Sequence, residues 1–488
     1  MKILYAASMA RPFVATGGLA DIAESLPKAL NKKKGVDCRV VIPLYSKIPD
    51  TLRLKMKYLT NFNVCLSWRN LYCGIFEAEH NGVTYYFIDN EQYFKRDELH
   101  GYPDDGERFA FFSLAILEML PHIDFKPDII NANDWHTALV PIYRQTFHAY
   151  NEFYSDIKTV FTIHNISFQG IYDYNMLYDI FALPPWSGSI VKYTGMINLV
   201  KGAIETAHAV TTVSPTYADE IAGLRPDPSG YDFGKGLTTF ISERNWKLTG
   251  ILNGIEADPM NDRDVYVNYG ISDVKEGKTQ NKLQLQKRLG LLERSDVPLV
   301  STVTRIDSQQ KGCQHIIEAI DGGLLDDNDI QFIMLGSADP NDIDGKKMED
   351  RFRELEIKYK GKMVSYIGFL PELSQKIYAG SDIFLMPSLY EPCGLSQMIS
   401  MKFGTIPVVR QTGGLNDTVT DNQSGTGNGF TYKHYDSLDF RKAIERSLLA
   451  YADADGWNEL VTRAMECDFS WDTSVIEYIE LYRRLLSE

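Results

Sequence analysis

The chain has 488 residues, which is enough for roughly two to four domains at about 100–200 residues each. Hydrophobic residues make up 44% and charged residues 24%, and these proportions exclude long disorder, collagen-like repeats and a coiled-coil rod. The net charge of -15 opposes binding to a phosphate backbone or an anionic membrane, so neither nucleic acid nor a membrane is expected as a main partner. An anionic small ligand must therefore be held by local cations or by helix N-termini.

The cysteines are widely spaced and contain no C-x-x-C pair, so we expect reduced thiols rather than a disulfide framework. They are Cys38, Cys65, Cys73, Cys313, Cys393 and Cys467. No signal peptide precedes the first predicted strand, and no segment approaches the ~20 apolar residues that a membrane span requires. A cytoplasmic location is the resulting expectation.

Short apolar runs alternate with longer helical patterns along the chain, which is typical of βαβ units around parallel sheets. The predicted strands span residues 2–7, 38–43, 83–88, 129–131, 159–163 and 210–213 in the first half, and 299–303, 331–335, 364–367, 383–386 and 406–409 in the second. Two such series predict two doubly wound α/β domains.

A helix is predicted between the first two strands because Ile22, Leu26 and Leu30 recur at helical spacing, although Pro27 interrupts the pattern. A domain boundary is predicted near residues 248–264, where an apolar run gives way to turn-rich sequence. This divides the chain into residues 1–250, residues 251–470 and a terminal segment 471–488. Ligands of such sheets bind beyond the carboxyl ends of the strands, and a site shared by two domains is expected in the cleft between them.

Polar residues follow several of these strands. Gly17 and Gly18 precede a helix, where N–H groups can hold a phosphate, but a tight turn without a ligand explains two glycines better. Asp134 and His136 follow one predicted strand and His164 ends another. A histidine at a strand end is either a hydrogen-bonded structural residue or part of a site, and two such clusters leave both readings open.

Two segments in the second half of the chain carry charged residues and glycines that can bind a ligand. Arg305 and Lys311 flank the turn after strand 299–303, so they suit a diphosphate whose charge they can offset without a metal, or they form a solvated surface pair. The segment 387–397 joins a strand to a helix and contains Glu391, followed by Gly394, and a ligand site explains this density better than a solvated loop.

No H-E-x-x-H, paired cysteine or EF-hand pattern is present, so no metal and no cofactor are expected. Three D-x-D triplets, at residues 262–264, 342–344 and 453–455, resemble those of metal-dependent sugar transferases. None follows a buried strand, so we assign them no metal.

With these motifs the sequence resembles the bacterial glycogen synthases, the ADP-glucose-dependent starch/glycogen synthase family of retaining glycosyltransferases. The resemblance covers almost the whole chain, through T-G-G-L-A-D at 16–21, E-R-F-A-F-F at 107–112, D-W-H at 134–136, T-I-H-N at 162–165, T-T-V-S-P-T-Y-A at 211–218, N-G-I at 253–255, E-P-C-G-L-S-Q at 391–397, R-Q-T-G-G-L at 410–415 and D-F-S-W at 468–471. It implies a GT-B fold, with the glucan acceptor on the first domain, the donor nucleotide mainly on the second, and a last helix crossing back to the first.

The resemblance also implies roles for individual residues. The catalytic group is Glu391, His164, Arg305, Lys311 and Asp134; the donor-binding group is Gly17, Gly18, Cys393, Gly394, Leu395 and Ser396; the acceptor side is Asp21, Tyr102, Asn165 and Gln169. Glucose would pass from a nucleotide sugar to the non-reducing end of an α-1,4-glucan with retained configuration. The sequence does not distinguish front-face substitution from a covalent intermediate on Glu391.

Three positions depart from the family pattern. Ala15 replaces a lysine before T-G-G-L, Met9 replaces a glutamate, and one extra residue separates Arg305 from Lys311. A missing charge-assisted hydrogen bond is worth roughly 1.5–3 kcal/mol, or about one to two orders of magnitude in rate. Arg11 is a candidate substitute cation. The alternatives are a transferase that prefers UDP-glucose or another nucleotide sugar, and a glucan-binding pseudoenzyme.

Overall fold

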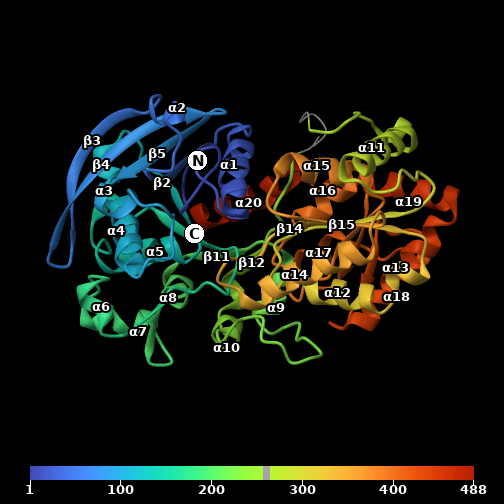
Figure 1. Ribbon diagram of the computed structural model, residues 1–488. Helices are drawn as coiled ribbons and strands as arrows, with labels where there is room; N and C mark the ends of the chain where they lie inside the picture. The colour runs from blue at the N-terminus through green and yellow to red at the C-terminus, as the bar shows by residue number, and fades with distance from the viewer. Residues whose placement is uncertain (257–263) are drawn as a thin grey trace. The chain divides into compact units, whose positions relative to one another are not determined.

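The computed structural model describes residues 1–256 and 264–488 and divides the chain into two compact units (Figure 1), which we describe separately. Unit 1 comprises Met1–Pro226, Asp232–Gly254 and Trp471–Glu488, and unit 2 comprises Asp227–Tyr231 and Ile255–Ser470. Part of the predicted boundary region, including Asp262 and Arg263 of one D-x-D triplet, lies outside the described residues.

Unit 1 contains a nine-stranded sheet in the order β12-β11-β7-β6-β1-β2-β5-β4-β3. Neighbouring strands are parallel from β12 to β5, and β4 and β3 are antiparallel. The strands are β1 (Lys2–Ala6), β2 (Asp37–Pro43), β3 (Lys57–Leu66), β4 (Arg69–His80), β5 (Val83–Asp89), β6 (Ile129–Asn133), β7 (Lys158–Ile163), β11 (Ala209–Thr212) and β12 (Leu248–Gly250), and a small separate sheet contains β8 (Ile171–Tyr172), β9 (Lys192–Tyr193) and β10 (Met196–Asn198).

The helices of unit 1 are α1 (Gly18–Asn31), α2 (Asp50–Arg53), α3 (Glu91–Phe94), α4 (Asp105–Glu118), α5 (Leu139–Thr146), α6 (Met176–Asp179), α7 (Gly188–Val191), α8 (Leu199–Thr206), α9 (Pro215–Ile221), α10 (Thr238–Ser242) and α20 (Trp471–Ser487). Helix α1 continues through Pro27 because Ile22, Leu26 and Leu30 are buried on one face, and this burial outweighs the hydrogen bond that Pro27 cannot donate. The predicted helix is confirmed.

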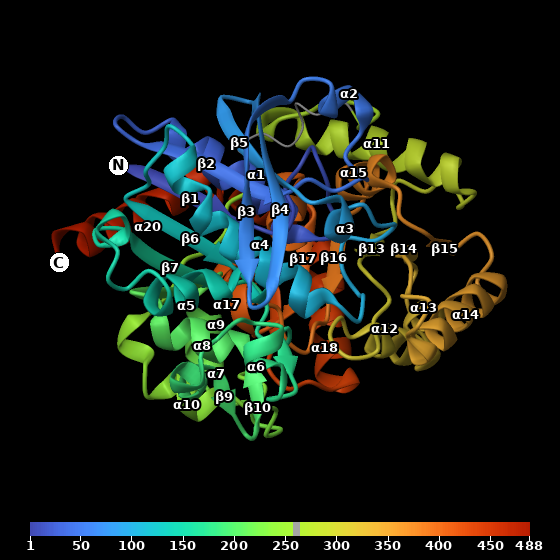
Figure 2. The same cartoon turned by 90° about the vertical axis from the view of Figure 1, so that its left-hand side faces the viewer.

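The terminal helix α20 packs against α1, although the two lie at opposite ends of the chain (Figures 1 and 2). Its apolar face is buried, and the Tyr482 hydroxyl donates to Asn131 Oδ1 at 2.7 Å. Asn131 lies in β6, so α20 is attached to the central strands of unit 1 by a buried hydrogen bond as well as by apolar packing.

Unit 2 contains a six-stranded parallel sheet in the order β15-β14-β13-β16-β17-β18. Its strands are β13 (Leu299–Val303), β14 (Gln331–Gly336), β15 (Met363–Ile367), β16 (Ile383–Met386), β17 (Ile406–Arg410) and β18 (Phe430–Tyr432); its helices are α11 (Val274–Leu289), α12 (Cys313–Asp321), α13 (Leu324–Asp327), α14 (Ile343–Lys358), α15 (Pro371–Gly380), α16 (Ser396–Lys402), α17 (Gly413–Thr418), α18 (Ser437–Tyr451) and α19 (Ala454–Glu466).

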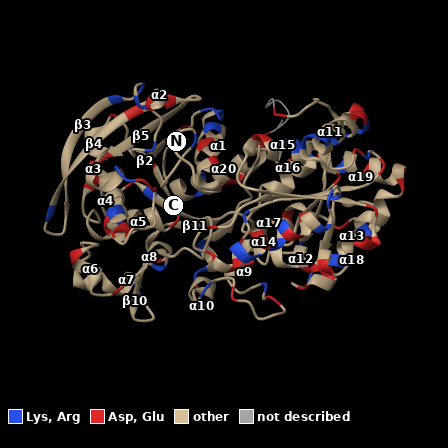
Figure 3. Cartoon of the chain, viewed as in Figure 1, with Lys and Arg blue, Asp and Glu red and all other residues tan. Residues whose placement is uncertain are grey.

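Both faces of the unit 2 sheet are covered, which explains why its strands are continuous apolar runs. Val300 and Phe332 belong to the core cluster on one side, whereas Leu299 and Ile333 belong to the cluster on the other. Charged residues of both signs instead lie on the helices around the sheet (Figure 3).

Every strand predicted from the sequence is present, with ends that differ by at most two residues, and the predicted α/β class is confirmed. The hairpin of β3 and β4, which forms the outer edge of the unit 1 sheet (Figure 2), was not predicted. Most side chains of β3 are exposed or half-buried, so the strand lacks the apolar run by which the others were identified.

Candidate active site

The topology of each sheet marks one place where ligands bind. In unit 2 the strand order is 3-2-1-4-5-6 by position in the chain, and it reverses between β13 and β16. In unit 1 the same order runs from β5 to β11 and reverses between β1 and β6. Ligands of doubly wound sheets bind beyond the carboxyl ends of the strands at such switch points. The segments that follow these four strands carry most of the predicted site residues.

The turn after β13 holds Arg305 and Lys311. Asp307 Oδ1 accepts the backbone N–H groups of Gln309 and Gln310 at 2.7 and 2.8 Å, which closes the turn. Gly312 then begins α12 at φ 68°, and a side chain there would lie 2.0 Å from the carbonyl oxygen of Pro387. The turn after β13 therefore packs directly against the loop after β16, and only glycine permits this approach.

The loop after β16 carries Glu391 and is also packed closely by backbone. Gly413, at φ 43°, would place a side chain 1.9 Å from the carbonyl oxygen of Glu391, and Gly414 N–H donates to that oxygen at 3.1 Å. The two glycines of R-Q-T-G-G-L thus allow the segment after β17 to support the Glu391 loop.

Glu391 is almost fully buried, at 6% exposure, and its carboxylate is paired. Lys311 Nζ lies 2.7 Å from Glu391 Oε2, and the Ser388 hydroxyl donates to the same oxygen at 3.0 Å. A buried carboxylate requires such partners, because an isolated charge is costly away from water. The structure therefore brings two predicted catalytic residues into direct contact.

Arg305 is largely exposed, with 66% of its side chain accessible. Its guanidinium Nη1 lies 3.3 Å from Asp307 Oδ2, and Nη2 donates to Gln310 Oε1 at 3.1 Å. Arg305 is thus held by two neighbours of its own turn while its head group stays accessible to a ligand.

Gly394, Leu395 and Ser396 lie where the Glu391 loop enters α16. Gly394 has φ 73°, a conformation that favours glycine. The Gln397 side chain donates to the carbonyl oxygens of Cys393 and Gly394 at 3.2 and 3.0 Å, and these two hydrogen bonds stabilise the turn. Ser396 bonds the Tyr378 hydroxyl.

In unit 1, Asp134 follows β6 with a positive φ of 57° and accepts His164 N–H at 2.8 Å. Burial raises the pKa of Asp134 to about 7, although N–H donors from His164 and Asn165 lower it. The carboxyl group therefore changes charge near neutral pH.

His164 is held in a single tautomer by Asn133. The Asn133 amide nitrogen donates to backbone carbonyls at 2.9 and 3.1 Å, so its oxygen is the acceptor that faces His164 Nε2 at 2.9 Å. Nε2 must then carry the proton, and the buried Nδ1 is a bare acceptor with no protein partner among the described residues. Burial lowers the pKa of His164 to about 3, so the ring is neutral at physiological pH.

Two further residues, predicted to lie on the side of the acceptor glucan, form hydrogen bonds within and around the loop after β7. The Asn165 side chain accepts Ser167 N–H at 3.0 Å. Buried Gln169 donates to the carbonyl oxygens of Ile166 and Lys235 at 3.0 and 3.1 Å and accepts from Asn198 at 2.6 Å. The Gln169 amide thus bonds to other residues of the protein and stabilises the loop.

The segment after β1 leads to an exposed helix start. Gly17 and Gly18 are exposed, and added side chains would meet no atom within 4 Å. Arg11 Nε lies 2.5 Å from Asp21 Oδ1, and both side chains are almost half exposed. Met9 is buried and accepts a hydrogen bond from Thr16, whereas Ala15 is exposed.

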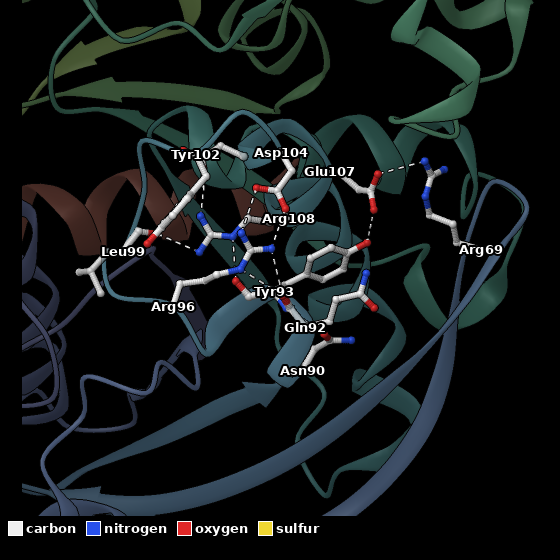
Figure 4. Close-up of polar contacts among 11 residues, drawn as sticks. Arg69, Asn90, Gln92, Tyr93, Arg96, Leu99, Tyr102, Asp104, Glu107 and Arg108 are labelled. Carbon is white, nitrogen blue, oxygen red and sulfur yellow. Dashed lines mark hydrogen bonds and ion pairs between the residues drawn. The ribbon is translucent and has the colours of Figure 1, made fainter.

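Figure 4 shows Tyr102 beside the guanidinium groups of Arg96 and Arg108, whose central carbons lie 5.2 and 5.1 Å from the ring centroid. Arg108 is fully buried, pairs with Asp105 and donates to the carbonyl oxygens of Tyr93 and Leu99. The Tyr102 oxygen accepts Glu98 N–H at 2.8 Å. The Tyr102 ring therefore lies close to two cations.

Several residues in these networks were not singled out from the sequence: Asn133, Gln310, Ser388 and Arg108. Asn133, Gln310 and Ser388 lie one to three residues from a predicted site residue and Arg108 lies six from Tyr102, but their partners are visible only in three dimensions.

In the described part of the chain, no group of three or more His, Cys, Asp or Glu side chains is arranged to hold a metal ion. Asp342 and Asp453 of the D-x-D triplets instead cap the helices α14 and α19. Among the helices of residues 1–256 and 264–488, none has the length and apolar character needed to cross a membrane.

Comparison with known proteins shows the family to which the chain belongs. The family model of the starch synthase catalytic domain matches residues 2–243, and that of glycosyl transferases group 1 matches residues 286–459. Glycogen synthase from Bacillus cereus strain B4264 is 44% identical over 494 residues, covering 100% of both chains. The chain belongs to the glycogen synthase family. The glycogen synthase of Desulforamulus reducens, with 44% identity over 496 residues, covers 100% of this chain and 99% of its own.

As a member of the glycogen synthase family, the chain is a glycosyltransferase. The catalytic domain of starch synthase IV from Arabidopsis thaliana, solved with ADP and acarbose, has a TM-score of 0.88 and 34% identity, covering 100% of this chain and 99% of its own. Sucrose-phosphate synthase from Thermosynechococcus elongatus shares the fold alone, with a TM-score of 0.62 and 18% identity over 100% of this chain and 99% of its own. The predicted family and GT-B fold are confirmed.

Proposed function

We propose that this glycogen synthase transfers glucose from ADP-glucose to the non-reducing end of an α-1,4-glucan with retained configuration. The observation that carries this proposal is the paired Lys311 and Glu391 at the switch point of unit 2, beside the accessible Arg305. The similarity to a starch synthase bound to ADP and acarbose supports an adenine nucleotide and a glucan as ligands.

In unit 2, Arg305 and Lys311 bind the diphosphate and offset the charge of the leaving nucleoside diphosphate. Glu391 faces the donor glucose, where a carboxylate stabilises an oxocarbenium-like centre or accepts sugar hydroxyls. The turn of Gly394 and Leu395 presents backbone groups to the phosphates. These cations supply the charge that the reaction requires, so the proposed chemistry uses no metal.

In unit 1, His164 Nδ1 accepts a hydrogen bond from a hydroxyl group of the transferred glucose. The ring carries its proton on Nε2, which leaves Nδ1 as an acceptor. Asp134 lies beside it and accepts a further hydroxyl when ionised. Tyr102, which lies close to Arg96 and Arg108, contacts the acceptor glucan.

Arg11 is the proposed substitute for the lysine that Ala15 replaces. It lies in the loop that follows β1, and its pairing with Asp21 leaves almost half of its side chain exposed. We expect Arg11→Ala to lower kcat/KM for the nucleotide sugar by about 10-fold. Arg483→Ala, at an exposed position of α20, is the control, and equal values for the two variants contradict this role.

The donor assay tests the whole proposal. Purified protein is incubated with glycogen and radiolabelled ADP-glucose or UDP-glucose. Incorporation from ADP-glucose supports the proposal, and incorporation from UDP-glucose alone shows a changed donor. No incorporation from either identifies a pseudoenzyme, which Ala15 and Met9 would then explain.

A further inference from the structure

We propose that Gln310 is a positioning residue that orients Arg305 and the Glu391 loop together. This inference rests on the proposed function, because it assigns to one amide the alignment of the diphosphate clamp with the carboxylate. Gln310 is almost fully buried, at 5% exposure, and lies between the two segments that follow β13 and β16.

The Gln310 side chain uses both ends of its amide. Its oxygen accepts from Arg305 Nη2 at 3.1 Å, and its nitrogen donates to the carbonyl oxygen of Tyr390 at 3.3 Å. The Gln310 carbonyl oxygen in turn accepts Leu389 N–H at 2.8 Å. Since Tyr390 immediately precedes Glu391, the amide joins the peptide that carries the carboxylate to the cation that faces the ligand.

The turn holds the Gln310 backbone independently of this side chain. Asp307 accepts Gln310 N–H, and the close approach of Gly312 to Pro387 fixes the position where the turn ends. Glu391 keeps its own contacts to Lys311 and Ser388. Removing the amide should therefore leave the fold intact and release only the orientation of Arg305 and of the Tyr390 peptide.

The exposure of Arg305 explains why such orientation matters. A long side chain that is 66% accessible loses rotamer freedom when it binds a diphosphate. An acceptor on a buried, immobile amide restricts Arg305 before the ligand arrives, which reduces that loss. Because the same amide supports the Tyr390 peptide, nucleotide affinity and turnover both depend on Gln310.

Gln310→Met tests the inference, since methionine has a similar length but neither donates nor accepts strongly. We expect ADP affinity, measured by calorimetry, to fall about 3- to 10-fold, and kcat with ADP-glucose to fall by a similar factor. The KM for glycogen and the Tm should stay close to those of the unmodified protein. Gln309→Met, at the exposed neighbouring position, is the matched control and should change none of these values.

A double-mutant cycle with Arg305→Ala separates positioning from a general structural effect. If Gln310 acts on the nucleotide through Arg305, Gln310→Met should have little further effect on ADP affinity in the Arg305→Ala background. It should still lower kcat in that background, through the Tyr390 contact. Additive losses of ADP affinity, or values for Gln310→Met equal to those of Gln309→Met, overturn the inference.

If the methionine variant does not fold, Gln310→Asn is the alternative test, because asparagine keeps a polar group but is too short to reach both partners. The same losses are expected. ADP binding is measured without turnover, so a protein that binds ADP but transfers no glucose contradicts the proposed function while the role of Gln310 in binding is still tested.

Discussion

Asp134 and His164 of unit 1 differ in electrostatic state from the site residues of unit 2. In unit 2 the groups at the strand ends are formally charged and paired, with Lys311 on Glu391 and Arg305 beside Asp307. In unit 1, Asp134 and His164 are half-buried and neutral or nearly so, because burial raises the pKa of Asp134 to about 7 and lowers that of His164 to about 3.

This difference matches the two proposed substrates. An anionic donor approaching a chain of net charge -15 needs fixed cations, and unit 2 supplies them at a switch point of its sheet. The transferred glucose and the glucan are uncharged and need directional hydrogen-bond partners, and unit 1 supplies an unprotonated imidazole nitrogen and a carboxyl group. The same topology thus presents different chemistry in each unit.

The largest effect is expected where the charges are paired. Glu391→Gln removes the negative charge that faces the donor glucose and leaves Lys311 without its carboxylate, so kcat should fall on the order of 100-fold or more. Steady-state kinetics with ADP-glucose measures the loss. Glu354→Gln, at an exposed position of α14, is the control, and a similar kcat for both variants removes Glu391 from the reaction.

A smaller loss of activity is expected when His164 of unit 1 is replaced. His164→Ala should lower kcat/KM by about 10- to 100-fold, because one hydrogen-bond acceptor for the sugar is lost. The ratio of wild-type to variant values should be constant from pH 6 to 9, since a pKa of about 3 keeps His164 neutral over that range. A ratio that varies with pH in this interval contradicts the neutral tautomer. His122→Ala, at an exposed position, is the control.

Adding a cation at position 15 of unit 1 should increase activity with the anionic donor. Ala15→Lys places a positive charge at the exposed start of α1, and we expect kcat/KM for the nucleotide sugar to rise by about 10-fold. Ala452→Lys adds the same charge at an exposed position of unit 2. An equal gain in both variants shows a general effect of net charge rather than a local contact.

The smallest effect concerns stability and follows from Asp134. Its folded pKa of about 7 exceeds the ordinary value near 4, so between these values the folded state binds a proton that the unfolded state has lost. The free energy of unfolding therefore declines as pH rises toward 7 and levels off above it. Asp134→Asn cannot ionise and keeps an acceptor for His164 N–H.

The apparent Tm of Asp134→Asn, relative to wild type, should thus be higher at pH 8 than at pH 5, by a few degrees. Calorimetry at the two pH values measures this difference. Asp97→Asn, at an exposed position of unit 1, should show no such dependence. The same relative Tm at both pH values for Asp134→Asn contradicts the raised pKa.

Most of the parallel strands were predictable because each contains a buried apolar run between turns, as in β14 and β16. The hairpin of β3 and β4 was not, since most side chains of β3 are exposed or half-buried and the strand is held by backbone pairing with β4. Asp134, His164 and Glu391 were identified because they follow strands, and their roles stay predictions.

The sequence by itself determined which polar residues end the strands, since the periodicity of apolar residues locates those ends. Only the tertiary structure decided the state of those residues. Lys311 and Glu391 are 80 positions apart in the chain, and Asn133 and His164 are 31 apart. Pairing, tautomer and pKa depend on distance and burial in space, which the folded sheets create and the order of residues does not display.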